Sequence, residues 1–207
     1  MLELRGARTL AMGRTRWVYP HPDHEDRLIK IIRPQIGEEK ETRWFDGRKF
    51  RRRFGRYVSF SREINELLSA WARNRRCPPA LQKIHGLVET DLGLGLVVEK
   101  LVDGNGHLAP TLDNLIAERG LDGELRRDIA ALEAELDSSH IVLGELHPGN
   151  IVRANDPMTG VFRLVLVDSF GEKLLIPVLS MSRSLNRRRN RRLFTELIRD
   201  LERRSRV

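Results

Sequence analysis

One segment of the chain, residues 143–152 (LGELHPGNIV), places polar residues at fixed offsets between apolar ones. It contains Glu145 and, five residues later, Asn150, and Asp168 follows 18 residues after Asn150 at the end of an apolar stretch. An amide and a carboxylate suit a hard Mg²⁺ ion that also keeps water and phosphate oxygens, and a second carboxylate can orient a hydroxyl nucleophile. Together the three residues have the chemistry that a phosphoryl-transfer site requires.

Each of these residues also has a structural interpretation. Asn150 follows Pro148 and Gly149, so its amide could stabilise a turn. His147 is best explained as a loop histidine that is hydrogen-bonded to the backbone. For Glu145 two interpretations stay open: a catalytic base and a structural acid. The pattern as a whole favours a site, because packing does not require polar residues at these offsets.

A phosphoryl-transfer site also needs a cation near the phosphates and a backbone that can approach them. Lys30 lies in the stretch LIKII, where the alternation of a strand puts it on the same face as Leu28 and Ile32. It is therefore either an edge lysine whose stem reaches water or an amine that faces a cleft. Gly13 lies in the turn between the first strands, and it lets the backbone approach a phosphate because it has no side chain.

The elements that must position these residues follow from periodicity and turn signals. Strands are expected at 16–19 and 28–32, which form a hairpin, and at 162–167. A second pair of strands is expected around residues 91–95, and its second strand is 94–98. Helices are expected at 60–74, 111–119, 122–137 and 187–203.

In the first of these helices, the apolar residues Ile64, Leu67, Leu68 and Trp71 recur at helical spacing and are expected to face the core. The composition changes from strands with one helix to mostly helix at about residue 101. We therefore expect an α+β fold with two lobes: residues 1–100 form a sheet with a helix, and residues 101–207 form a small helical lobe with a basic terminal helix.

The order and local sequence of these features resemble the protein-kinase-like superfamily, and more closely the bacterial family of PhoP regulatory network protein YrbL. The resemblance runs over most of the chain and is carried by VYPHPDH, LIKII, HGLVETDLGLG, HPGNIV and DSFGEKLLIP. It implies a minimal two-lobed protein-kinase-like fold, with ATP and Mg²⁺ as cofactors. It also implies a bacterial, magnesium-responsive regulatory context with no settled phosphate acceptor, which could be a small molecule or a protein.

The resemblance implies a role for each candidate residue. In kinases a lysine on an early strand contacts the phosphates and pairs with a glutamate on the next helix, a hinge backbone binds adenine, and an amide with a carboxylate holds the metal. In this chain the nucleotide-binding residues are then Gly13, Lys30, Glu99 and Leu101, the metal ligands are Asn150 and Asp168, and the catalytic residues are Glu145, Lys30 and Glu63.

Three positions depart from the kinase pattern. Ala11 stands where a further glycine is usual, which weakens the cradle for phosphates. Leu143 and Glu145 replace the usual histidine and aspartate, and the additional methylene moves the carboxylate by roughly 1 Å, which can cost on the order of 100-fold in rate. The segment 168–171 (DSFG) is one residue longer than the usual metal-binding tripeptide. Two functions therefore stay open: an ATP-dependent phosphotransferase, and a pseudokinase that binds nucleotide with little turnover.

The charge of the chain adds a third candidate function. The formal net charge is +8, which favours phosphates, nucleic acid or an anionic membrane as partners. Two basic clusters dominate, at 48–56 and 183–192, and runs of this kind are most often solvated faces. The alternative is an anionic partner that binds at Arg187 to Arg192.

Other classes of protein are disfavoured by composition. No stretch approaches the roughly 20 apolar residues that span a bilayer, and the start lacks a signal-peptide pattern, so a cytoplasmic protein without a transmembrane segment is expected. Cys77 is the only cysteine, and the six histidines lack the helical spacing of a zinc site. Only 36 residues follow Gly171, so the helical lobe is expected to lack a full activation segment and a broad peptide-docking surface.

Overall fold

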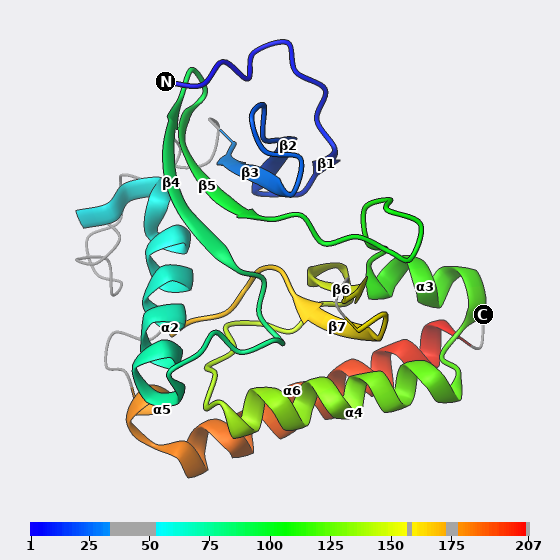
Figure 1. Cartoon of the computed structure of the whole chain (residues 1–207). Helices are drawn as coiled ribbons and strands as arrows, with labels where there is room; N and C mark the ends of the chain where they lie inside the picture. The colour runs from blue at the N-terminus through cyan, green and yellow to red at the C-terminus, as the bar shows by residue number, and fades with distance from the viewer. Residues whose placement is uncertain (34–52, 157–158, 173–177, 206–207) are drawn as a thin grey trace. The chain divides into compact units, whose positions relative to one another are not determined.

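The computed structural model describes residues 1–33, 53–156, 159–172 and 178–205, which form two units (Figure 1). The first unit comprises Met1–Ser61 and Lys83–Lys100, and the second comprises Arg62–Gln82 and Leu101–Val207. Strands and helices are both present, which confirms the α+β class. The basic cluster predicted at 48–56 lies largely outside the described residues. The division into lobes at residues 100 and 101 stays a prediction.

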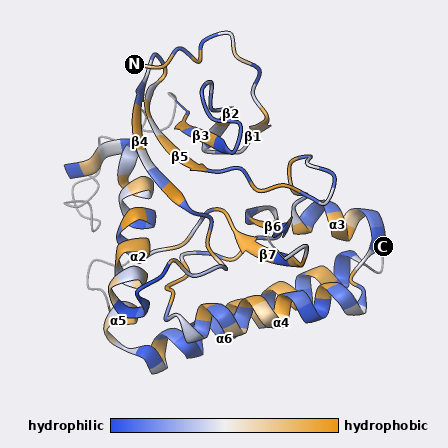
Figure 2. Ribbon diagram, in the orientation of Figure 1, coloured by the Kyte–Doolittle hydropathy of each residue, from blue (hydrophilic) through white to orange (hydrophobic). Residues whose placement is uncertain are grey.

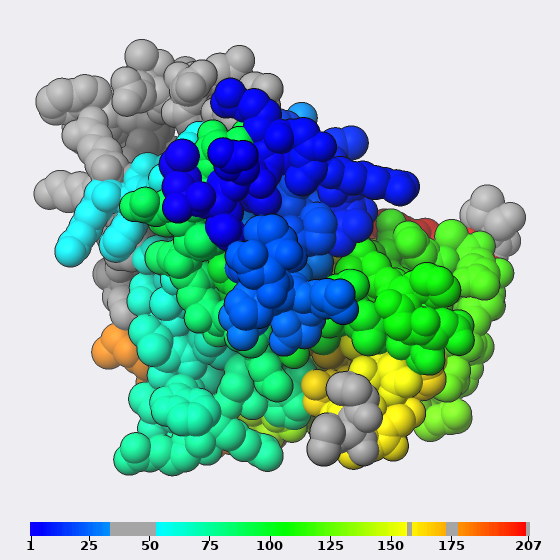
Figure 3. Space-filling view, turned by 45° about the horizontal axis from the view of Figure 1, so that its top comes forward, coloured from blue at the N-terminus to red at the C-terminus, as the bar shows by residue number. Residues whose placement is uncertain are grey.

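Within its described residues, the first unit contains an antiparallel sheet of five strands in the order β1-β2-β3-β5-β4. The strands are β1 (Ala11–Met12), β2 (Arg16–Pro20), β3 (Arg27–Ile32), β4 (Ile84–Thr90) and β5 (Gly93–Glu99). β2 and β3 form the predicted hairpin, and Figure 3 shows the segment between them, in mid-blue, at the surface. Because β3 pairs with both β2 and β5, it is an interior strand of this sheet.

One face of this sheet packs around the buried residues Leu4, Tyr19, Ile29, Ile31 and Val97. The neighbouring strand leaves room for them at Gly95, where a Cβ atom would lie 2.6 Å from Cγ2 of Ile29. The amides of Leu4 and Arg5 donate to the carboxylate of Asp91 at 2.7 and 2.9 Å, which joins the start of the chain to the β4–β5 turn.

The second unit is mostly helical. Beyond the part of α2 (Val58–Asn74) that belongs to it, its elements are α3 (Leu112–Arg119), α4 (Gly123–Ser138), the short 3-10 helix η2 (Pro148–Asn150), the antiparallel pair β6 (Ile151–Asn155) and β7 (Phe162–Leu166), α5 (Val178–Met181) and α6 (Arg183–Arg204). α4 and α6 lie side by side (Figure 1), and polar and apolar residues alternate along both (Figure 2). The core of the unit includes Leu125, Ile129, Leu132 and Leu136 from α4 with Phe194, Leu197 and Leu201 from α6. Across the described ranges, none of the helices has the length and apolarity that a membrane span requires.

The terminal helix begins earlier than its sequence pattern predicts. The prediction was residues 187–203, whereas α6 begins at Arg183. Ser182 is its N-cap, and its hydroxyl accepts a hydrogen bond from the amide of Leu185 at 3.4 Å. The added turn carries polar residues, including the buried Asn186, so apolar periodicity alone could not detect it.

The predicted helix at 60–74 is confirmed as α2 (Val58–Asn74), but its predicted core-facing stripe is wrong at two of four positions, since only Ile64 and Leu67 are partly buried. Leu68 and Trp71 are 61% and 53% exposed, whereas Glu63, Glu66 and Ala70 are buried. The reason is a specific contact: the carboxylate of Glu66 accepts a buried backbone hydrogen bond, so this face of the helix is chosen by polar pairing as well as by apolar area.

Candidate functional site

Four residues of the second unit are joined by hydrogen bonds where two loops run together: Glu145, Asn150, Asp168 and Ser169, here called the loop cluster. Asn150 ends η2 directly before β6, and Asp168 lies just beyond β7. Because Ile151 pairs with Leu166 in an antiparallel ladder, the residues before one strand and after the other lie at the same end. The sequence prediction that Asn150 and Asp168 share one site therefore has a structural basis in the β6–β7 pair.

Ser169 makes the contacts that hold the loop cluster together. The side-chain amide of Asn150 donates to the Ser169 hydroxyl at 3.0 Å. The Ser169 carbonyl accepts from the amides of Gly144 and Glu145 at 2.8 and 3.3 Å, and the Ser169 amide donates to the carboxylate of Asp168. One residue thus contacts all three predicted members of the cluster.

The backbone of Ser169 adopts φ +67°, a left-handed conformation that is uncommon for residues other than glycine. Sequence reasoning missed Ser169 as a functional residue, although it noted that the segment 168–171 has one additional residue. That additional residue is the available signal, because the left-handed turn accommodates it and directs its carbonyl toward residues 144 and 145.

The two loops continue in register after the turn. Leu143 and Phe170 form an antiparallel bridge, and the Gly171 amide donates to the Val142 carbonyl at 2.8 Å. Gly171 has φ +97°, and a Cβ atom there would lie 2.7 Å from the Arg62 carbonyl oxygen on α2. Glycine is required at this position by both conformation and space, which fixes the loop against the helix.

Glu66 is a second residue that sequence reasoning did not assign. Its carboxylate accepts a hydrogen bond from the Val142 amide at 2.8 Å and is buried. The pKa of Glu66 is raised to about 7, chiefly by burial and to a smaller extent by the nearby Glu172 carboxylate, against the opposing effects of the Val142 hydrogen bond and Arg73. Glu66 therefore ties α2 to the strand-like segment that leads to Glu145.

The structural interpretation predicted from the sequence holds for His147 but not for Asn150. His147 is the N-cap of η2, and its Nδ1 atom accepts from the Gly149 amide at 3.0 Å, so its prediction as a backbone-bonded loop histidine is confirmed. Asn150 uses its side chain to reach Ser169, 19 residues away, rather than the local turn. The turn-stabilising alternative for Asn150 is therefore not what its amide does.

The remaining predicted residues are distributed over both units. In the first unit, Lys30 is 6% exposed on the interior strand β3, opposite Val18 and Leu96, so the alternative of an edge lysine is wrong. In the second, Glu63 is 2% exposed on α2. A pairing of Lys30 with Glu63 stays a prediction.

The residues that were predicted to contact adenine and phosphate make contacts within the protein. Gly13 lies in the β1–β2 turn, where its amide donates to the Arg16 carbonyl at 2.9 Å. Glu99 ends β5, and its carboxylate accepts from the Lys83 amide at 2.7 Å. The Leu101 carbonyl accepts from the Ala109 amide at 2.9 Å. Their roles toward a nucleotide stay predictions.

The side-chain oxygens of the loop cluster fit a Mg²⁺ ion whose other ligands are phosphate and water. When the Asn150 amide nitrogen donates to Ser169, the amide oxygen is the atom that can ligate, and Asp168 adds a carboxylate. In the described ranges, no group of three or more His, Cys, Asp or Glu residues is placed to hold a metal ion. One or two protein oxygens with phosphate and water is the coordination that Mg²⁺ commonly has in such sites.

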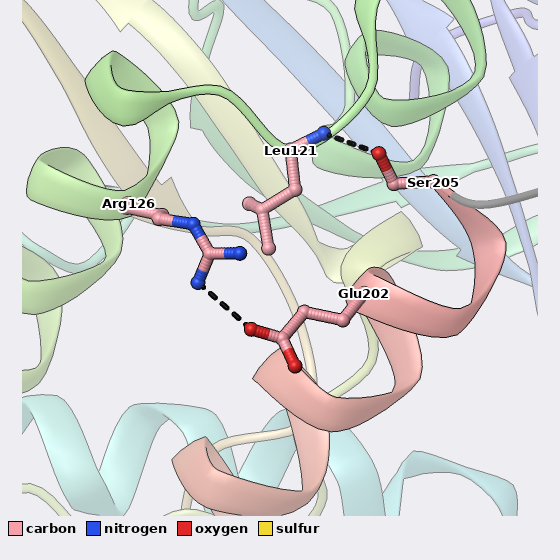
Figure 4. Close-up of a pocket in the computed structure, with 4 residues that line it drawn as sticks. All are labelled: Leu121, Arg126, Glu202 and Ser205. Carbon is pink, nitrogen blue, oxygen red and sulfur yellow. Dashed lines mark hydrogen bonds and ion pairs between the residues drawn. The ribbon is translucent and has the colours of Figure 1, made fainter.

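Two pockets of the second unit lie outside the loop cluster. The first, of about 120 Å³, is lined by Leu121, Arg126, Glu202 and Ser205. Arg126 donates to the Glu202 carboxylate at 2.9 Å and the Leu121 amide donates to the Ser205 hydroxyl at 3.1 Å (Figure 4), so the lining residues connect the C-terminal end of α6 to the start of α4. The second, of about 470 Å³, is lined by Arg183, Ser184, Arg187, Arg188 and Arg191 of α6.

Comparison with known proteins agrees with the geometry. Residues 2–202 match the family model described as PhoP regulatory network protein YrbL. The YrbL proteins of Escherichia coli (strain K12) and Shigella flexneri are each 28% identical over 202 residues, which covers 96% of this chain and 87% of theirs. A double mutant of the Mycobacterium tuberculosis PknI kinase domain matches with a TM-score of 0.50 and 22% identity, over 78% of this chain. The match covers 56% of that kinase domain, so the similarity concerns the fold.

Proposed function

Because the chain belongs to the PhoP regulatory network protein YrbL family and has a protein-kinase-like fold, we propose that it is an ATP- and Mg²⁺-dependent phosphotransferase that acts on a hydroxyl acceptor. The observation that carries the proposal is the loop cluster, in which Ser169 contacts Glu145, Asn150 and Asp168. The proposal includes the PhoP regulatory context that the family description names, which we take to be magnesium-responsive, and a cytoplasmic location, where ATP is available.

Each residue of the proposed site has a distinct task. Bound ATP with Mg²⁺ would supply the phosphoryl group and neutralise the charge that develops on it. Asn150 and Asp168 would hold the metal through their side-chain oxygens, and Lys30 would contact the phosphates. Glu145 is exposed, and its carboxylate orients the acceptor hydroxyl and receives its proton.

Nucleotide and metal binding can be tested by thermal unfolding. ATP at 100 times its dissociation constant adds about 2.7 kcal/mol to the free energy of unfolding, which corresponds to about 5 to 11 °C for a chain of this size. We expect this shift to require both Mg²⁺ and Asp168. The variant Asp168→Asn keeps the shape of the side chain and should lose the shift. The control Asp26→Asn changes a carboxylate that is 74% exposed and should keep it. An equal shift in wild type and Asp168→Asn would contradict the proposed metal site.

Turnover separates the phosphotransferase from the pseudokinase alternative. Glu145→Gln removes the proton acceptor but keeps nearly the same side-chain size. We expect it to lower ATP turnover on the order of 100-fold, the lower end of what general acid–base catalysis contributes, without removing the Mg²⁺-ATP shift. If wild type and Glu145→Gln share the same background turnover but both bind Mg²⁺-ATP, the pseudokinase function is the correct one.

A second candidate function, binding of an anionic partner, is favoured by the arginine-lined pocket on α6. Arg187 pairs with Asp137 at 3.2 Å, and the exposed residues Arg188 and Arg191 also line the pocket. Binding of a duplex oligonucleotide would then weaken steeply with salt, as counterions are released. The double variant Arg188→Glu with Arg191→Glu should abolish that binding, and an unchanged affinity would remove this candidate.

A further inference from the structure

The helix α6 carries polar side chains toward the segment that precedes Glu145. Asn186, Arg189 and Asn190 have the i, i+3, i+4 spacing of one helical face. Asn186 and Asn190 are 1% and 0% exposed, and their amide nitrogens both donate to the Ile141 carbonyl, at 2.8 and 3.1 Å.

Arg189 reaches further along the same segment. Its two terminal nitrogens donate to two successive carbonyls, those of Leu143 and Gly144, the second at 3.1 Å. Its planar, forked guanidinium can bond two oxygens at once in a fixed geometry, which a lysine cannot do.

The segment 141–145 depends on these contacts because it lies outside the helices and named strands, which would otherwise pair its backbone. Its amides have partners on one side: Val142 donates to Glu66, and Gly144 and Glu145 donate to Ser169. On the other side, the carbonyls of residues 141, 143 and 144 accept from α6.

Packing alone does not explain the asparagines. The side-chain oxygens of Asn186 and Asn190 are buried without a hydrogen-bond partner among the described residues. Apolar side chains would avoid that cost, and Phe194, Leu197 and Leu201 fill the same face of α6 further along. The asparagines are therefore retained for the Ile141 carbonyl.

We infer that α6 is a positioning element for the reaction, and that Arg189 is its principal positioning residue. By holding the carbonyls of Leu143 and Gly144, Arg189 fixes the backbone from which Glu145 projects, although it does not touch the reacting atoms. This inference rests on the proposed function. The inference also separates Arg189 from the predicted anionic-partner patch. Arg189 binds backbone carbonyls of the protein, whereas Arg188 and Arg191 line the arginine-lined pocket of α6.

The test compares Arg189→Met and Arg189→Lys with Arg199→Met, which removes an exposed arginine of α6 outside the arginine-lined pocket. We expect Arg189→Met to lower kcat by at least about 10-fold at an unchanged KM for ATP, because a small displacement of a catalytic group is costly while nucleotide binding uses other residues. Arg189→Lys should recover only part of kcat, since one ammonium cannot hold both carbonyls. Arg199→Met should match wild type.

A second measurement is independent of turnover. The amides of Gly144 and Glu145 should exchange hydrogen at least about 10-fold faster in Arg189→Met than in wild type, while amides of α3 and α4 keep their rates. Unchanged exchange at residues 144 and 145 would overturn the inference, as would an unchanged kcat in an active enzyme. If wild type has no turnover, the proposed phosphotransferase function fails while the exchange result still decides the role of Arg189. Arg189→Lys, which keeps charge and length, serves if Arg189→Met does not fold.

Discussion

Replacing Glu66 with glutamine should change how the stability of the protein depends on pH. Glu66 is buried on α2, and its carboxylate accepts a hydrogen bond from the Val142 amide at 2.8 Å. Glutamine has nearly the same shape and keeps a side-chain oxygen that can accept this bond, but it has no proton to lose. The substitution therefore removes the ionisation of residue 66 while leaving its packing largely intact.

The magnitude follows from the pKa of Glu66, which burial raises from 4.5 to about 7 in the folded protein. Below pH 4.5 both the folded and unfolded states hold the proton. Between pH 4.5 and 7 the unfolded state has lost it while the folded state keeps it, so the free energy of unfolding falls as the pH rises. The accumulated loss is about 3 kcal/mol, since one pKa unit corresponds to about 1.4 kcal/mol. Above pH 7 the loss is constant.

The assay is urea unfolding of wild type and Glu66→Gln at half-unit steps from pH 5 to pH 8. Other ionisable groups affect both proteins, so the difference between their free energies of unfolding isolates Glu66. From pH 5 to pH 8 we expect the free energy of unfolding of Glu66→Gln to rise by about 2 to 3 kcal/mol relative to that of wild type. This corresponds to a change of about 1 M in the difference between their urea midpoints. Glu118→Gln, which removes an exposed carboxylate from α3, is the matched control.

A free-energy difference that stays constant from pH 5 to pH 8 would refute the reasoning, because it would mean that Glu66 ionises equally easily in the folded and unfolded states. A difference that moves the other way, with wild type gaining as the pH rises, would mean that the folded state stabilises the carboxylate. The Val142 hydrogen bond would then outweigh burial.

Three further substitutions test the packing around the sheet and the site. Gly95→Ala should destabilise the protein by about 1 to 3 kcal/mol in urea unfolding, because the new Cβ atom would lie 2.6 Å from a methyl group of Ile29. Gly171→Ala should lower the melting temperature and also weaken the Mg²⁺-ATP shift, since it forces the loop away from the Arg62 carbonyl beside the loop cluster; an intact shift would show that the cluster tolerates the movement. Thr111→Ala should cost about 1 kcal/mol by removing the N-cap of α3, and unaltered thermal stability would show that this cap is dispensable.

The sequence predicts the elements of this protein better than their orientation. The hairpin of β2 and β3 follows from apolar strands around a turn, and the period of α4 follows from Leu125, Ile129, Leu132 and Leu136. In α2 the apolar period wrongly placed Leu68 and Trp71 in the core and did not identify the buried Glu66. A periodicity argument counts apolar area, whereas Glu66 is buried because a backbone amide 76 residues away needs an acceptor, which no local pattern encodes.

The candidate site was predictable in part for a similar reason. Asn150 and Asp168 stand out because they flank two apolar strands, and antiparallel pairing then brings them to one end of the ladder. Ser169 could not be assigned from its type, since its role depends on a left-handed backbone conformation and on a carbonyl that every residue possesses. Arg189 was hidden within a run of arginines, and only its contacts with Leu143 and Gly144 distinguish it from its neighbours.

The contacts from α6 have a consequence for the order in which the protein matures during synthesis. Arg189 is made 44 residues after Glu145, which at ordinary translation rates is roughly 2 to 9 s later. From the synthesis of Asp168 until that of Arg189, 21 residues later, the chain contains Glu145, Asn150 and Asp168, but the carbonyls of residues 141, 143 and 144 lack the full set of their α6 partners. The nascent protein is thus expected to pass through a stage in which the proposed catalytic residues are present but not yet held in place.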